Sequence, residues 1–186
     1  MLEPFSTQIV AGGSLAPDRK TDVRRLRDIR AIYQDVPAGL DDVVVYRVHH
    51  MPVPETPSQI QTSTTVLEAG TVGAEYFMTK GHFHEVRERS EVYVGLSGEG
   101  LLLMASEAGD HRVLEMREGT IAYVPGGWAH RSANTGSEPL VFFAAFVGDA
   151  GHDYETVAAR GFPILAVTGA QGPEIVANPR FERPAR

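Results

Sequence analysis

After Pro37 the chain divides into short runs rich in β-branched, aromatic and aliphatic residues, with glycine or proline between them. The runs cover residues 43–48, 62–67, 75–79, 91–96, 101–105, 120–124 and 140–147. Strands this closely spaced, with turn residues between them, predict a β-sandwich or small barrel and not repeated strand–helix–strand units. The 19 glycines and 12 prolines fit such a turn-rich, all-β architecture.

The segment before Pro37 follows a different pattern. Residues 1 to about 20 predict an irregular arm that ends in the turn Ala16-Pro17-Asp18. Behind Thr21-Asp22, apolar side chains recur with helical spacing, and one amphipathic helix with a side-chain oxygen cap is expected to dock outside the β structure. These apolar positions are Val23, Leu26, Ile29, Ile32 and Tyr33.

A length of 186 residues fits one domain. We expect residues 1–186 to form it, with the arm and helix in 1–40, the barrel in about 41–181 and a tail in 182–186. A short helix at 154–160 and a last strand at 174–176 complete the prediction, and residues 179–186 are expected at the surface.

Composition excludes several classes of function. The net charge of −7 and the lack of a basic stripe argue against nucleic-acid binding, which needs clustered lysine and arginine. The absence of cysteine removes disulfides, thiolate metal ligands and cysteine nucleophiles. The chain has no signal-peptide pattern at its start and no apolar stretch of about 20 residues, so a soluble, cytoplasmic protein without membrane partners is expected.

The sequence Gly81-His82-Phe83-His84, followed by Glu91, is the first candidate for chemistry. Residues two apart in a strand point to the same face, so His82 and His84 would present two imidazoles side by side. A hairpin loop through residues 85–90 would bring the Glu91 carboxylate beside them. The adjacent pair His49-His50 cannot do this, because neighbouring strand residues point to opposite faces.

A second motif lies in GTIAYVPGGWAHRSAN, where Pro125-Gly126-Gly127 forces a tight turn and His130 leads the chain back into extended structure. A fourth ligand would thus come from a separate strand. The spacing of Gly119, Pro125, Gly127, His130 and Asn134 resembles the second cupin motif. The segment around His82, His84, Glu91 and Gly98 resembles the first, except that Tyr76 replaces a glycine and the spacing before Glu91 is longer.

That longer spacing is a feature of cupin-type phosphoglucose isomerases, which the chain also resembles directly. The phrases EYFMTKGHFHE, EVYVGLSGEG, YVPGGWAHRSAN and DAGHDYETVAARGF are similar to that family's own and occur in the same order, across about residues 64–181. The resemblance implies an all-β cupin fold, a jelly-roll or double-stranded β-helix barrel. It also implies the interconversion of glucose 6-phosphate and fructose 6-phosphate, a reaction of glycolysis and gluconeogenesis.

The implied metal ligands are His82, His84, Glu91 and His130. Imidazole and carboxylate with open positions suit Fe, Mn, Ni, Zn or Co, and the resemblance suggests Fe(II). A divalent ion would stabilise the negative oxygen formed when a proton leaves carbon beside a carbonyl. Glu91 is the candidate base that moves this proton between C2 and C1; a metal-assisted hydride shift, which needs no base, is the alternative.

The resemblance also implies substrate contacts at Tyr46, Thr65, Thr79, Gly81, Tyr93, His152 and Tyr154. Thr65, Thr79 and the Gly81 amide would hold the phosphate. Strict alternation puts Thr79 and Gly81 on the face opposite His82, so a bend at Gly81 is required. His152 and Tyr154 would protonate the ring oxygen or bind hydroxyls, alongside the catalytic Glu91. The family more often has tyrosine where this chain has Phe146.

Other readings stay open at this point. Mannose 6-phosphate isomerisation could be a side activity of the same pocket. A cupin dioxygenase would use an open iron site for oxygen, and a non-enzymatic cupin would only bind a sugar. The resemblance, together with the apolar run at 140–147, predicts a homodimer.

Overall fold

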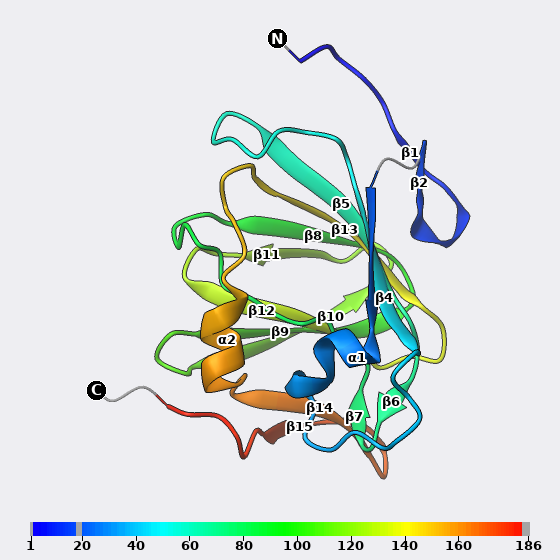
Figure 1. Ribbon diagram of the computed structural model, residues 1–186, viewed down its shortest axis with the longest axis vertical. Coiled ribbons are helices and arrows are strands. Elements are labelled where there is room, and N and C mark those ends of the chain that lie inside the picture. Colours follow the sequence, from blue (N-terminus) through cyan, green and yellow to red (C-terminus); the bar gives the residue numbers. More distant parts are fainter. Residues whose placement is uncertain (1, 18–19, 184–186) are drawn as a thin grey trace.

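A six-stranded antiparallel sheet forms one wall of the computed structural model, which describes residues 2–17 and 20–183 (Figure 1). Its order is β11-β8-β13-β5-β4-β3, with bounds Ile121–Val124, Glu91–Ser97, Leu140–Val147, Ile60–Leu67, Val44–His50 and Lys20–Arg25. Successive neighbours pair antiparallel throughout. The wall is therefore made of strands from both halves of the chain.

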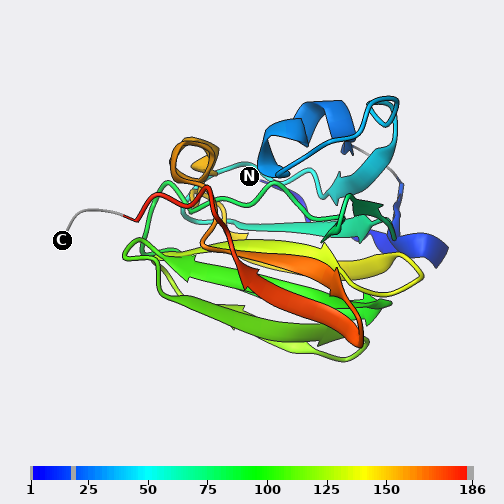
Figure 2. The ribbon, with the colours of Figure 1, turned by 90° about the horizontal axis from the view of Figure 1, so that it is seen from below.

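Two smaller sheets complete the barrel, which has the cupin architecture that the motifs predict (Figure 2). One has the order β10-β9-β12 and the other β15-β14-β7-β6. Their bounds are His111–Arg117, Glu99–Ser106 and Trp128–Asn134 for the first sheet, and Gly172–Ala177, Ile164–Gly169, Glu75–Tyr76 and Thr71–Val72 for the second. A short hairpin of β1 (Gln8–Ile9) and β2 (Leu15–Ala16) and two helices, α1 (Leu26–Ile29) and α2 (Tyr154–Arg160), lie at the periphery (Figures 1 and 2).

Side-chain alternation gives the six-stranded sheet two different faces. On the inner face, Glu91 lies opposite Phe146, and Tyr93 lies opposite Ala144. On the outer face, Val94 lies between Ile121 and Phe143 in one cross-strand row. The inner face carries the candidate site, whereas the outer face is apolar across β11, β8 and β13.

An irregular extended segment, residues 77–82, runs beside β12 and joins the two smaller sheets. The Thr79 amide donates to the Ser132 carbonyl at 2.9 Å, and the His130 amide donates to the His82 carbonyl at 3.0 Å. Between these pairs Lys80 and Gly81 together face Arg131 alone, which is a β-bulge. Gly81 has φ +77°, a backbone conformation that glycine adopts without steric cost.

The helix expected after Thr21-Asp22 begins only at Leu26, and its N-cap is Arg25, so that part of the prediction is wrong. Lys20–Arg25 instead forms β3 and pairs with β4. A strand satisfies these backbone groups on the barrel edge, and tertiary pairing outweighs the helical spacing of the apolar residues. Leu26, Ile29 and Tyr33 are nevertheless buried as that spacing predicts.

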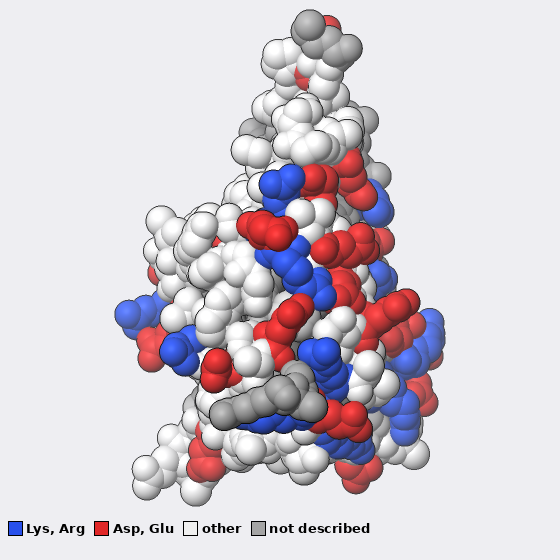
Figure 3. All heavy atoms as spheres, turned by 90° about the vertical axis from the view of Figure 1, so that its left-hand side faces the viewer, with Lys and Arg blue, Asp and Glu red and all other residues white. Residues whose placement is uncertain are grey.

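Strands β10 and β14 were not predicted from the sequence, whereas the helix at 154–160 and the strand at 174–176 are confirmed. Within the described residues, no helix is long and apolar enough to cross a membrane. On the face shown in Figure 3, lysines and arginines interleave with acidic side chains and do not form a continuous basic surface. Residues 184–186 of the expected tail lie outside the described part.

Candidate metal centre and cavity

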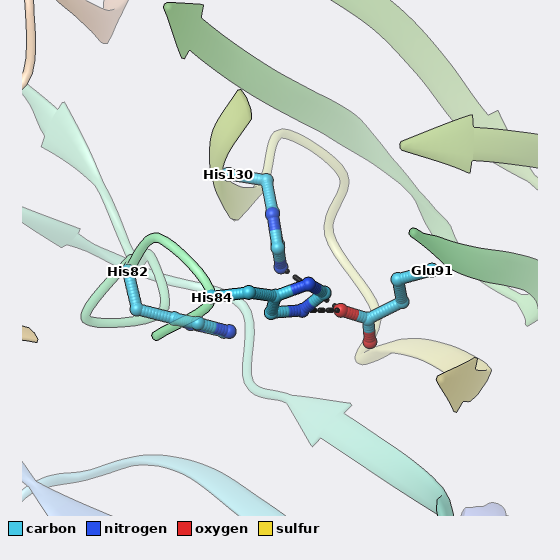
Figure 4. Close-up of side chains that lie close together, drawn as sticks. All are labelled: His82, His84, Glu91 and His130. Atoms are coloured by element: carbon cyan, nitrogen blue, oxygen red, sulfur yellow. Dashed lines mark hydrogen bonds and ion pairs between the residues drawn. The ribbon is translucent and has the colours of Figure 1, made fainter. Parts of the chain in front are cut away.

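Four side chains that the sequence singled out converge inside the barrel (Figure 4). His82 and His84 come from the segment after the bulge, Glu91 opens β8, and His130 lies in β12. One ligand atom from each lies within 4.8 Å of the others. The His84 Nε2 and His130 Nε2 atoms are 3.1 Å and 3.0 Å from the same Glu91 oxygen. His84, Glu91 and His130 are buried, and His82 is partly buried.

Backbone carbonyls orient two of the imidazoles. The His84 Nδ1 atom lies 2.8 Å from the Arg89 carbonyl oxygen, and the His130 Nδ1 atom lies 3.2 Å from that of Trp128. A carbonyl can only accept, so each Nδ1 carries the proton and each Nε2 is the metal-facing nitrogen. The His82 Nε2 atom is buried with no hydrogen-bond partner among the described residues. This donor set fits a divalent metal ion.

The electrostatics of the cluster agree with that fit. Burial, with His130 beside it, lowers the pKa of His82 well below its usual value, which keeps this imidazole neutral. Burial alone would raise the pKa of Glu91, but the neighbouring His130 and His84 imidazoles outweigh it and lower that pKa. Burial would likewise lower the pKa of His84, and the hydrogen bond with Glu91 raises it instead. Glu91 is therefore a carboxylate at neutral pH.

The loop between His84 and Glu91 is fastened to the segment before α2. The Arg89 guanidinium donates to both carboxylate oxygens of Asp149, each at 2.8 Å. Arg87 pairs with Asp153, which also accepts from the Thr156 amide at 3.0 Å and so caps α2. Since Arg89 also holds His84 through its carbonyl, this loop links the metal ligands to the residues around His152.

A cavity of about 320 Å³ opens from this cluster. Every residue for which the resemblance implied a substrate contact lines it: Tyr46, Thr65, Thr79, Gly81, Tyr93, His152 and Tyr154, together with the candidate base Glu91. They come from β4, β5, the 77–82 segment, β8 and the start of α2. The structure therefore brings the implied residues together around one cavity.

The β-bulge explains how Thr79 and His82 share one wall of that cavity. One extra residue between them reverses the alternation, which is the bend at Gly81 that the sequence argument required. The Thr79 hydroxyl accepts from the Ser132 amide at 3.0 Å, so its own proton is free to point elsewhere. No hydrogen bond from the Gly81 amide occurs within the described part of the chain.

Several charged residues of the cavity were not assigned from the sequence. Lys20, Asp22 and Arg24 alternate along β3 and face the cavity, as period-two spacing places them. The wrong helix assignment hid this signal. Lys80 also lines the cavity, and its Nζ lies 4.3 Å from the centroid of the Tyr154 ring.

Aromatic rings close the other side of the cavity. The His152 and Tyr154 rings stack with centroids 5.7 Å apart and an interplanar angle of 10°. Phe146 lies 5.6 Å from the His152 ring and 6.1 Å from the His84 ring. It has no hydroxyl to offer, so this wall beside the candidate centre is apolar where tyrosine would be polar.

Comparison with known proteins points in one direction. The family model described as "Glucose-6-phosphate isomerase (GPI)" matches residues 19–178. Proteins named glucose-6-phosphate isomerase from Pyrococcus abyssi and Thermococcus litoralis are 38% and 40% identical to the chain, covering 97% and 96% of it and 98% and 97% of their own lengths. A protein from Rhizobium meliloti named putative glucose-6-phosphate isomerase 2 is 37% identical, over 95% of this chain and 93% of its own.

Proposed function

Because the chain belongs to the glucose-6-phosphate isomerase family, we propose that it interconverts glucose 6-phosphate and fructose 6-phosphate with a divalent metal ion bound by His82, His84, Glu91 and His130. The observation that carries this proposal is the convergence of the four ligand atoms within 4.8 Å at the end of a cavity. Fe(II) is our proposed native ion, with Mn, Ni, Zn or Co as substitutes.

The bound ion would supply Lewis acidity to the two substrate oxygens at C1 and C2. The protein supplies the rest. Glu91 is ionised and buried beside that position, so it could take the proton from C2 and return it to C1 on the same face of the substrate. Tyr93 lies on the same inner face two residues along β8 and lines the cavity.

We assign the phosphate of the substrate to the opposite part of the cavity. The Thr65 and Thr79 hydroxyls and the Gly81 amide are neutral donors of the kind that bind phosphate, and Arg24 and Lys80 add positive charge beside them. This local charge matters because a net charge of −7 would otherwise repel a sugar phosphate. Tyr46 holds the bulge, since its hydroxyl accepts from the Lys80 amide at 3.4 Å.

His152 and Tyr154 line the cavity beside the cluster, and the Lys80 ammonium group lies over the Tyr154 ring. Their stacked rings contact the His82 ring, with centroids 4.5 Å and 5.3 Å away. In this position they could exchange a proton with the ring oxygen of the sugar, which must be released before an aldose can isomerise. We propose this role for His152, with Tyr154 orienting it.

The deciding experiment is a coupled assay of fructose 6-phosphate conversion before and after chelation, followed by restoration of single metals. We expect chelation to remove activity, and Fe(II) or another divalent ion to restore it in proportion to the metal bound. Mannose 6-phosphate tested in the same series measures the side activity. Full activity in a sample shown to be metal-free would refute the metal-dependent mechanism.

A further inference from the structure

Arg131 is a buried cation that makes no direct ion pair among the described residues, although the charge of the buried Glu75 lies close enough to act on it. Its side chain belongs to β12 and points away from the cavity, because its neighbours His130 and Ser132 face the other way. Only 3% of the residue is exposed, and no ion pair within 4.0 Å involves it among the described residues. A buried guanidinium is costly unless something compensates its charge. The charge of Glu75 compensates part of this cost, and the hydrogen bonds of the guanidinium compensate another part.

The guanidinium of Arg131 fits directly into the bulge at Lys80 and Gly81. Its Nη2 donates to the Lys80 carbonyl at 2.8 Å, and a Cβ atom on Gly81 would lie only 2.7 Å from its Nε. The Nε itself is buried without a partner. The ring of Phe162 covers the other side, with its centroid 4.6 Å from the guanidinium carbon. Arg131 thus contacts the bulge at the Lys80 carbonyl, whereas the Tyr46 hydroxyl contacts it at the Lys80 amide.

The bulge in turn sets the geometry of two groups that face the cavity. The Thr79 hydroxyl and the Gly81 amide share the cavity wall with His82 only because the bulge reverses alternation between them. A positive charge directly behind these neutral donors would also favour an anion in front of them, since the dielectric response of the interior is weak. The Arg131 guanidinium would thus both contact the bulge and provide the positive charge behind it.

We propose that Arg131 is a positioning residue for the phosphate of the substrate: it pins the Lys80–Gly81 bulge and supplies, from behind the wall, the charge that Thr79 and Gly81 lack. The inference rests on the proposed function, because the anion in question is the phosphate group of the sugar. It adds a residue that touches neither the substrate nor the metal. Its contribution should accordingly appear in phosphate affinity and not in metal content.

The test compares R131M, which removes the charge and the hydrogen bond, with R131K, which keeps the charge. For each variant we would measure KM and kcat with fructose 6-phosphate, and the amount of bound metal. Calorimetry would give the dissociation constant of inorganic phosphate. For R131M we expect KM and the phosphate dissociation constant to rise roughly tenfold to a hundredfold, with metal content unchanged and kcat little affected. R131K should recover part of the loss.

R180M is the matched control. Arg180 donates to the Tyr33 carbonyl at 2.8 Å, on the outer side of the same region, and does not reach the bulge. It should lower the unfolding temperature without changing phosphate affinity. Should R131M fail to fold, R131K decides, because loss of the Lys80 contact alone predicts phosphate binding weaker by about twofold to tenfold.

A double-mutant cycle with T79V separates the bulge from a general effect on folding. If Arg131 acts through Thr79 and Gly81, T79V/R131M weakens phosphate binding by less than the product of the single changes. Unchanged phosphate affinity in the folded Arg131 variants, or strictly additive effects with T79V, would overturn the proposal. A wild-type protein that binds phosphate but does not isomerise the sugar would defeat the proposed function and leave this cycle interpretable.

Discussion

Under the proposed function, Glu91 would have two roles that compete for the same carboxylate. As a ligand it donates electron density to the ion, and as a base it must accept a proton. Its environment lowers the pKa, which ensures the ionised form but makes a weaker base. Proton transfer to Glu91 would then require a bound ion that acidifies the C2 proton, so the two proposed roles would depend on each other.

This dependence predicts how label from solvent behaves. Isomerisation in deuterium oxide should place deuterium at C1 of fructose 6-phosphate or at C2 of glucose 6-phosphate, detected by NMR at early times. E91Q should lose about 10²–10⁴ in kcat even after metal content is matched to wild type. Product free of solvent deuterium at every time point would instead favour the hydride shift and leave Glu91 as a ligand only.

The environment of His84 predicts that metal binding releases a proton from its imidazole. The hydrogen bond with Glu91 raises the pKa of His84, so the metal-free protein keeps a proton on this imidazole to a higher pH than an ordinary histidine does. A metal ion must displace that proton, and apparent metal affinity should therefore rise with pH through the raised pKa. Calorimetric metal titrations at neutral pH, in buffers of different ionisation enthalpy, should report net proton release. H84Q should abolish that release along with tight binding.

At the scale of the element, α2 depends on its N-cap. Asp153 accepts from both the amide and the hydroxyl of Thr156, at 3.0 Å and 2.7 Å, and pairs with Arg87. Burial alone would raise the pKa of Asp153, but these partners prevail and lower it to about 2. Because the helix begins two residues after His152, its cap also fixes one side of the cavity.

We expect D153A to reduce the free energy of unfolding at pH 7 by about 1–2 kcal/mol, the usual value of a lost N-cap. A carboxylate with a depressed pKa stabilises the fold above its unfolded value near 3.8 and loses that effect as pH falls towards about 2. The difference between wild type and D153A should therefore shrink across that range. Urea unfolding of chelated samples measures it, with E155Q on the same first turn as the control for simple charge loss. A difference independent of pH would contradict the ion-pair contribution.

Prediction from the sequence was most successful where residue type and spacing impose geometry directly. The convergence of the four candidate ligands follows from two motifs, and the strands that carry Glu91 and the 140–147 run follow from β-rich composition. It was wrong at Lys20–Arg25, where helical spacing of apolar residues coincides with a strand whose identity depends on pairing with β4. Such pairing is a long-range contact that no local pattern contains. Arg131 was missed for a similar reason, because a bulge becomes visible only when its partner strand is known.

At the scale of the whole molecule, the turn at residues 11–13 covers the outer face of the six-stranded sheet near Val66 and Val141, whereas the part formed by β11 and β8 is left open among the described residues. Ile121 and Tyr123 on β11 are 74% and 58% exposed, and Ile60 on β5 is 65% exposed. Val92 lies between Tyr123 and Ala145 in a cross-strand row parallel to that of Val94. An apolar face of this kind is typical of a surface that another protein covers. A second copy of the chain is the occupant that we expect, as the homodimer prediction requires.

A charged side chain introduced on this outer face should prevent dimerisation without changing catalytic activity. I121E introduces a carboxylate on the outer side of β11, whereas Glu91 and Tyr93 project from the inner side of the neighbouring strand. Light scattering coupled to gel filtration should find a dimer for wild type and a monomer for I121E. E115Q on β10, exposed and outside this sheet, serves as the control that stays dimeric. Activity per chain and metal content should survive in I121E, because all the candidate substrate contacts lie on the inner face or at the start of α2, away from Ile121. A monomeric wild type would show that the apolar face serves something other than self-association.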